Sequence, residues 1–214
     1  MQMLSLHAKR TAGLILIFAN MGVDTKLYYN NFSVRILYVM NKNTMKKYLS
    51  ELNTLLNEEN LYGEICIFGG SYITLMYKDD RMTDDIDSIF IRGKSQLLPL
   101  IKKIAQKYNI PMNWLNDAVK ETVEMSNKLT KNVYLAFSNL TIYTPPPEFI
   151  LAMKVMSTRA ETKDFEDIKV LVKNLKIKTV KEIENILKVH FPNKIIDYRN
   201  RIFLEELIKD VRSC

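Results

Sequence analysis

The residues with the greatest potential for chemistry are a pair of glycines followed by a pair of aspartates. Gly69 and Gly70 lie between an apolar segment typical of a buried strand and a segment with helical spacing that begins at Ser71. Glycines at such a junction let backbone N–H groups approach a ligand closely, and a helix N-terminus adds partial positive charge. The pattern predicts a cradle for phosphate groups, to which Ser71 can add a hydroxyl.

Asp85 and Asp87 lie two residues apart in a β-rich segment, so we expect both carboxylates on the same face of a strand. Two like charges side by side are unfavourable unless a cation neutralises them, and Mg²⁺ prefers oxygen ligands. The apolar neighbours Ile86 and Ile89 indicate a half-buried strand, where unneutralised acids are costly. A phosphate cradle followed by a metal-binding acid pair predicts metal-assisted nucleotidyl transfer.

Each feature taken alone also has a simpler explanation. The two glycines are compatible with a tight turn that binds nothing, and a single Asp-x-Asp is typical of an acidic surface loop. The combination of both, in this order and at this spacing, favours the chemical interpretation.

The same residues resemble a known signature. Gly70-Ser71, thirteen further residues and Asp85-Ile86-Asp87 are similar to the G-[GS]-x(n)-D-x-[DE] pattern of the nucleotidyltransferase superfamily, which has the DNA polymerase β-like fold. Residues 45–175 also resemble a family of small bacterial proteins related to the AbiEii abortive-infection toxins. The blocks that carry this resemblance are Phe68-Gly69-Gly70, Arg81-x-Thr83-x-Asp85-Ile86-Asp87, Trp114-Leu115-Asn116-Asp117, Pro147 to Lys154, and Lys154 with Arg159 and Lys163-Asp164-x-x-Asp167.

The resemblance implies a set of catalytic residues. Asp85 and Asp87 would bind one or two Mg²⁺ ions, and Lys154 would neutralise the triphosphate of the substrate. Asp164 or Asp167 would orient Lys154 or the acceptor. Without the resemblance, Lys154 and the two later aspartates would be typical of solvated charges on neighbouring helices.

The resemblance also implies a set of nucleotide-binding residues. Gly69, Gly70 and Ser71 would hold the β- and γ-phosphates of a nucleoside triphosphate. Arg81 and Thr83, from the block that contains the acid pair, would lie beside these phosphates.

The sequence departs from the superfamily in one respect. Many nucleotidyltransferases carry a third carboxylate on a later strand, yet residues 133–143 contain no Asp or Glu. Either Asp117, Asp164 or Asp167 replaces it from a helix, or two acids suffice, or transfer has been lost. Elsewhere, Trp114 is expected in the core rather than against a base, and Cys66 is expected to be an inert buried thiol.

The elements that must position these residues predict an α+β protein. We expect a mixed sheet flanked by helices over residues 41–143, in the nucleotidyltransferase fold, followed by a helical part over 144–214. The expected strands are Gly63–Phe68, Asp85–Ile91, Val133–Phe137 and Leu140–Tyr143. The expected helices are one that begins near Met45 with Thr44 as its cap, then Ser71–Tyr77, Ser95–Tyr108, Trp114–Met125, Phe149–Ser157, Asp164–Asn174, Val180–Val189 and Ile195–Val211.

Residues 1–40 differ from the rest and leave three explanations open. In one explanation the native protein starts at Met40 or Met45. In another the segment adds peripheral strands at Leu14–Phe18 and Phe32–Tyr38. A signal peptide is disfavoured because the apolar stretch is short and its cleavage site poor.

Composition narrows the classes further. Two cysteines and two histidines argue against a disulfide scaffold and against His-rich metal sites, and favour a reducing, cytoplasmic compartment. The net charge of +7 is compatible with phosphate-bearing partners and equally with a lysine-rich surface. No apolar run is long enough to cross a membrane.

From these features the sequence predicts a Mg²⁺-dependent enzyme that transfers NMP from an NTP. By analogy with the toxins, the acceptor is RNA such as a tRNA 3′ end, and an antitoxin protein is a partner. Two other hypotheses stay open: a catalytically degenerate nucleotide- or RNA-binding module, and transfer to a small molecule or a protein side chain.

Overall fold

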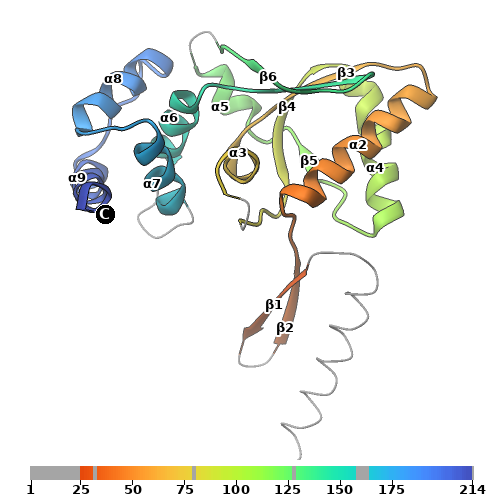
Figure 1. Ribbon diagram of the computed structural model, residues 1–214, viewed down its shortest axis with the longest axis horizontal. Helices are drawn as coiled ribbons and strands as arrows, with labels where there is room; N and C mark the ends of the chain where they lie inside the picture. Colours follow the sequence, from red (N-terminus) through yellow and green to blue (C-terminus); the bar gives the residue numbers. More distant parts are fainter. Residues whose placement is uncertain (1–24, 31–32, 79–80, 127–128, 158–163, 214) are drawn as a thin grey trace, which may run out of the picture.

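In the computed structural model, which describes residues 25–30, 33–78, 81–126, 129–157 and 164–213, the centre of the fold is a mixed five-stranded sheet (Figure 1). Its strand order is β5-β4-β3-β7-β6. The central strand β3 runs parallel to β7 and antiparallel to β4, and β4 runs parallel to β5. The strands of this sheet are β3 (Gly63–Ile67), β4 (Ile86–Arg92), β5 (Leu115–Asn116), β6 (Asn132–Ala136) and β7 (Leu140–Thr144).

Helices flank this sheet and continue beyond it. The helices are α2 (Lys42–Glu58), α3 (Gly69–Met76), α4 (Lys94–Tyr108), α5 (Lys120–Glu124), α6 (Pro147–Ser157), α7 (Asp164–Asn174), α8 (Val180–His190) and α9 (Tyr198–Ser213). Figure 1 shows α2 and α4 side by side near one face, whereas α6 to α9 gather at one end of the molecule. The predicted α+β class, with a C-terminal helical part, is confirmed.

Alternation along β3 explains why both faces of the sheet are covered. Ile65 and Ile67 pack into the core formed with α2 and α4, while Cys66 and Phe68 pack into the core formed with the C-terminal helices. Successive side chains of a strand point to opposite faces, so a strand that is buried on both faces is apolar throughout. β3 therefore joins the two hydrophobic cores.

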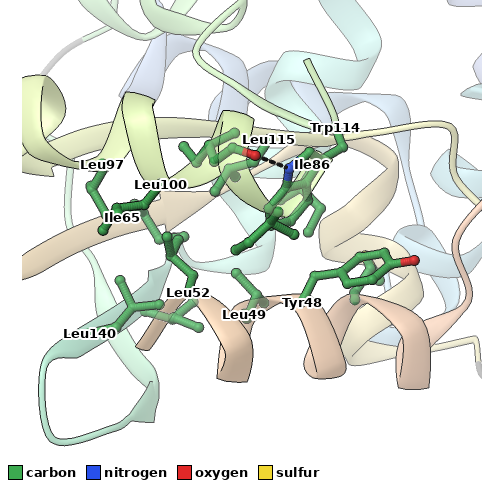
Figure 2. Close-up of a cluster of buried hydrophobic side chains, with 14 of the residues drawn as sticks. Tyr48, Leu49, Leu52, Ile65, Ile86, Leu97, Leu100, Trp114, Leu115 and Leu140 are labelled. Atoms are coloured by element: carbon green, nitrogen blue, oxygen red, sulfur yellow. Dashed lines mark hydrogen bonds between the residues drawn. The ribbon is translucent and has the colours of Figure 1, made fainter. Parts of the chain in front are cut away.

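The first core contains the single tryptophan of the chain (Figure 2). Trp114 is fully buried, and its indole Nε1–H donates to the carbonyl of Ile101 at 3.0 Å. This confirms the predicted core position and removes the alternative of base stacking. On the opposite side of β3, burial raises the pKa of the Cys66 thiol to about 12, as expected of an inert core cysteine.

The structure corrects three details of the predicted elements. Asn41, not Thr44, caps α2, because its side chain accepts a hydrogen bond from the Thr44 N–H. α3 begins at Gly69, so the glycine pair forms the first turn of the helix rather than a separate turn before it. Residues 114–125 hold the two-residue strand β5 and the short α5 rather than one helix.

The N-terminal segment contributes a separate two-stranded sheet. β1 (Thr25–Asn30) pairs antiparallel with β2 (Ser33–Tyr38), which corresponds to the strand expected at 32–38. The other expected strand, at 14–18, lies outside the described residues.

Within the part of the chain that the structure describes, no helix combines the length and apolar character needed to span a membrane.

Candidate active site

The junction between β3 and α3 lies directly against the acid pair. The backbone N–H of Phe68, the last residue before the helix, donates to the carbonyl of Asp87 at 2.8 Å. Gly69 has a φ of +60°, and a Cβ there would overlap the Asp87 carboxylate. Glycine is therefore required at position 69, both for its backbone conformation and for the close approach of the carboxylate.

Asp85 is held from a neighbouring strand. Its carboxylate Oδ2 accepts a hydrogen bond from Nδ2 of Asn116 at 2.9 Å, and its backbone carbonyl accepts one from the Thr83 hydroxyl at 3.0 Å. β4 begins one residue later, at Ile86, so Asp85 precedes the strand that was predicted to contain it. Asp87 lies within β4, where it pairs with Asn116 of β5 in the parallel register.

Electrostatics distinguish this acid pair from ordinary surface carboxylates. Burial, and then the nearby negative charge of Asp85, raises the pKa of Asp87 to about 6, although Lys154 opposes the rise. Burial also raises the pKa of Asp85, and the hydrogen bond from Asn116 acts in the opposite direction. Both groups are thus destabilised as anions, which a nearby cation would reverse.

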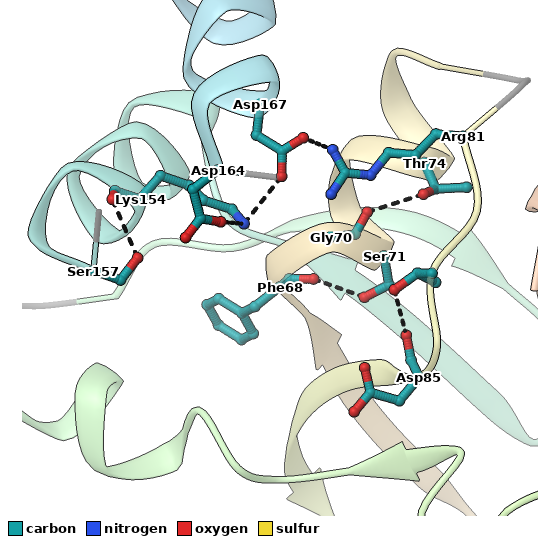
Figure 3. Close-up of polar contacts among 11 residues, drawn as sticks. Phe68, Gly70, Ser71, Thr74, Arg81, Asp85, Lys154, Ser157, Asp164 and Asp167 are labelled. Carbon is teal, nitrogen blue, oxygen red and sulfur yellow. Dashed lines mark hydrogen bonds and ion pairs between the residues drawn. The ribbon is translucent and has the colours of Figure 1, made fainter. Parts of the chain in front are cut away.

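Beyond the acid pair, a network of ion pairs joins α6 and α7 to the segment that precedes β4 (Figure 3). Lys154 of α6 lies 2.5 Å from Asp164 and 3.0 Å from Asp167, both on α7. Asp167 has no exposed side-chain surface, and it also pairs with the guanidinium of Arg81. Figure 3 shows Asp167 between Arg81 and Lys154, with the first turn of α3 close by.

Asp87 of the acid pair and Lys154 of the ion-pair network line a common cavity of about 190 Å³. Gly69 and Asp87 contribute one part of its lining, and Lys154 another. Its full lining comprises Gly69, Asp87, Val119, Thr122, Ile150, Met153, Lys154 and Ser157. The cavity combines one acid, one base and an apolar wall, which suits a ligand that carries both phosphate and an apolar part.

The predicted nucleotide-binding residues lie around the first turn of α3, but the Ser71 hydroxyl does not point to a phosphate site as expected. The Ser71 hydroxyl is buried and donates to the Phe68 carbonyl at 2.7 Å, so it turns into its own helix. A Cβ on Gly70 would lie 3.1 Å from Nη2 of Arg81 and 3.4 Å from Oγ1 of Thr83, which places both side chains beside this turn. Arg159 and Lys163 lie outside the described residues.

Asn116 is the functional candidate that the sequence interpretation missed. It belongs to the Trp114–Asp117 block, in which only Trp114, as a base-stacking residue, and Asp117, as a third carboxylate, were considered for a role. Asp117 instead pairs with Lys94 at 2.5 Å, whereas Asn116 contacts Asp85. The signal that could have identified Asn116 is its place in a second polar block after the acid pair.

The donor groups present fit a hard divalent cation. The carboxylates of Asp85 and Asp87 would supply the protein ligands, and phosphate and water oxygens would complete the shell, as Mg²⁺ usually requires. The Asn116 amide oxygen already accepts the N–H of Ala118 at 2.9 Å. Among the residues that the structure describes, no group of three or more His, Cys, Asp or Glu side chains could hold a metal ion by itself.

Comparison with known proteins agrees with this geometry. A family model described as "Nucleotidyltransferase of unknown function (DUF6036)" matches residues 43–207, which include the whole five-stranded sheet and α6 to α8. The chain therefore belongs to this family of nucleotidyltransferases. Neither a comparison with curated proteins nor one with solved structures finds a match.

The close approach of Gly69 to Asp87 predicts the effect of a single methyl group. We expect Gly69→Ala to lower the free energy of unfolding by about 1–3 kcal/mol, from its left-handed backbone and from the overlap with the carboxylate. Gly70→Ala is the comparison variant and should cost less than Gly69→Ala, because φ at position 70 is not positive and the atom nearest to its new Cβ, Nη2 of Arg81, lies 3.1 Å away. Urea denaturation followed by Trp114 fluorescence measures both, and equal losses would contradict the account.

The raised pKa of Asp87 predicts a pH dependence of stability in the absence of divalent cations. A carboxyl whose pKa rises on folding, here from 3.8 to about 6, stabilises the fold below its unfolded pKa and loses that contribution as the pH rises through 6. Relative to Asp87→Asn, the wild type should lose about 1–2 kcal/mol between roughly pH 4 and pH 7. Urea denaturation in EDTA across this range tests it, and parallel curves for the two proteins would refute it.

Proposed function

We propose that this nucleotidyltransferase is Mg²⁺-dependent and transfers NMP from a nucleoside triphosphate to a hydroxyl or phosphate acceptor. Membership of the family establishes the transferase class. The metal, the donor and the acceptor are proposals, and the single observation that supports them most is the contact between Gly69 and the Asp87 carboxylate. That contact brings a glycine turn suited to phosphate and an acid suited to a cation to one point.

The charges around the cavity suit a triphosphate with its metal. Burial disfavours the ionised carboxylates of Asp85 and Asp87. A bound cation would lower their pKa values and stabilise the site. Lys154 lines the same cavity and supplies a positive charge for phosphate oxygens. Asp164 and Asp167 fix the position of its ammonium group.

In the proposed reaction, the acceptor oxygen attacks the α-phosphorus of the NTP. A new P–O bond forms, the bond from the α-phosphorus to the bridging oxygen breaks, diphosphate leaves, and the proton of an attacking hydroxyl passes to solvent. The backbone at Gly69 and Gly70 holds the terminal phosphates, and Lys154 stabilises the charge that develops on them. Mg²⁺, when bound, supplies charge neutralisation and increases the acidity of the attacking hydroxyl.

The acceptor that we favour is RNA, for example a tRNA 3′ end, and a toxin role beside an antitoxin protein follows from the same analogy. These proposals rest on the similarity of the sequence blocks to the AbiEii-type toxins and on the net positive charge of the chain.

One observation favours a second candidate, a nucleotide- or RNA-binding module that has lost transfer. The strand beside Asp87 carries the amide Asn116 and not a carboxylate, and β6 and β7 contain no acid. A site with two carboxylates can bind a metal and a nucleotide without activating an acceptor.

Substitution of the acid pair distinguishes these candidates. In an assay with labelled NTPs, Mg²⁺ and bulk RNA, Asp85→Asn with Asp87→Asn should reduce incorporation by at least about 10³-fold, because the metal loses its protein ligands. Asp117→Asn is the matched control, since Asp117 pairs with Lys94, and it should retain nearly full activity. Retained nucleotide binding with no transfer by the wild type would favour the second candidate.

The contact between Asn116 and Asp85 predicts a positioning role. Asn116→Ala should reduce transfer by about 10–100-fold and raise the Mg²⁺ concentration needed for half-maximal activity, because outer partners orient metal-binding carboxylates. A fall in activity with an unchanged Mg²⁺ requirement would show that Asn116 acts only on stability.

A further inference from the structure

A second hollow surface lies between α8 and α9, away from the acid pair. This groove, which we call the α8–α9 groove, has a volume of about 350 Å³ and shares no lining residue with the cavity at Asp87. Its charged lining is almost entirely basic, with Glu205 as the one acid among the lining residues. The lining comprises Lys178, Thr179, Val180, Lys181, Arg201, Glu205, Ile208, Lys209 and Arg212.

The basic residues of the groove differ in their partners. Arg201 and Lys181 both pair with Glu184 of α8, so their charge is partly balanced. Among the ion pairs between described residues, none involves Lys178, Lys209 or Arg212, and all three side chains are exposed. The groove lining therefore carries a net positive charge, with five basic residues and one acid, on a concave surface that favours an anionic ligand.

The arrangement along α9 indicates an elongated ligand. Arg201, Glu205, Ile208 and Arg212 recur at helical spacing, so they lie on one face of the helix. At 1.5 Å per residue, Arg201 and Arg212 are about 16 Å apart along the helix axis. That length exceeds a single phosphate group and corresponds to several successive phosphates of a nucleic-acid strand.

We propose that the α8–α9 groove binds the phosphodiester backbone of a polynucleotide acceptor whose end is extended in the cavity at Asp87. The inference rests on the proposed function and makes it more specific, because a polynucleotide acceptor is long enough to contact a second surface while its end lies in the cavity. A small-molecule acceptor has no use for the groove.

The test measures RNA binding by the full chain, independently of transfer. A fluorescently labelled single-stranded RNA of roughly 20 nucleotides is titrated by anisotropy at low and moderate salt. Lys209→Glu with Arg212→Glu should weaken binding by at least about tenfold and should reduce the slope of log affinity against log salt by about one or more. Lys102→Glu with Lys103→Glu is the matched control, because it changes the net charge equally on an exposed face of α4, and it should weaken binding by less than about threefold.

A second groove variant distinguishes a loss of RNA binding at the groove from a loss caused by misfolding of the first variant. Lys178→Glu with Lys181→Glu alters the opposite wall of the groove and should give the same loss, and urea denaturation checks that each variant folds. Equal losses in the groove and α4 variants, or no RNA binding by the wild type, would overturn the proposal. So would a groove variant that loses binding to phosphatidylserine vesicles or to a polyglutamate peptide while it retains RNA binding.

The outcomes also separate this inference from the proposed function. RNA binding that depends on the groove and persists in Asp85→Asn with Asp87→Asn supports the groove assignment, even if the wild type transfers no nucleotide. Transfer to a small molecule, with RNA binding unaffected by the groove variants, would refute the groove and leave the nucleotidyltransferase chemistry in place.

Discussion

A buried carboxylate, that of Asp167, connects the parts of the candidate active site. It has no exposed surface and lies between Lys154 of α6 and Arg81, which precedes β4. A buried charge without partners is strongly unfavourable, whereas one with two cations is tolerated. The requirement that Asp167 keep both partners therefore holds α6 and α7 against the segment that leads into the acid pair, and so brings Lys154 to the cavity that Asp87 lines.

The same site contains charges that are only partly balanced. Asp85 and Asp87 repel each other and are partly desolvated, while Lys154 divides its charge among Asp87, Asp164 and Asp167. A ligand that brings a divalent cation to the acids and phosphate oxygens to Lys154 would balance both sides at once. Because the Asn116 amide already holds the Asp85 carboxylate and the Phe68 N–H holds the backbone of Asp87, little rearrangement would be needed, and such preorganisation favours catalysis.

Much of this arrangement could be predicted from the sequence, and the exceptions have physical reasons. The apolar run before Gly69 was sufficient to predict β3, and the helical spacing of apolar residues was sufficient to predict α4 and α6 to α9. Burial imposes a clear period on the sequence of such elements. The strand β5 has only two residues, too few for a visible alternation, so the pattern did not predict the strand that brings Asn116 to Asp85. The burial of Asp167 was equally hidden, because an acid in the first turn of a helix usually faces solvent. The Ser71 hydroxyl can donate either to a backbone carbonyl of its own helix turn or to a ligand, and the residue type alone does not decide between them.

The structure of a complex with Mg²⁺ and a non-hydrolysable NTP would test most directly whether this site is built for a metal-bound triphosphate. We expect oxygens of both Asp85 and Asp87 at about 2.0–2.1 Å from a metal ion. We also expect the terminal phosphates at the backbone of Gly69 and Gly70, and the Lys154 ammonium within hydrogen-bonding distance of a phosphate oxygen. A triphosphate bound elsewhere on the chain, or bound at the glycine turn with neither aspartate on a metal, would contradict the account.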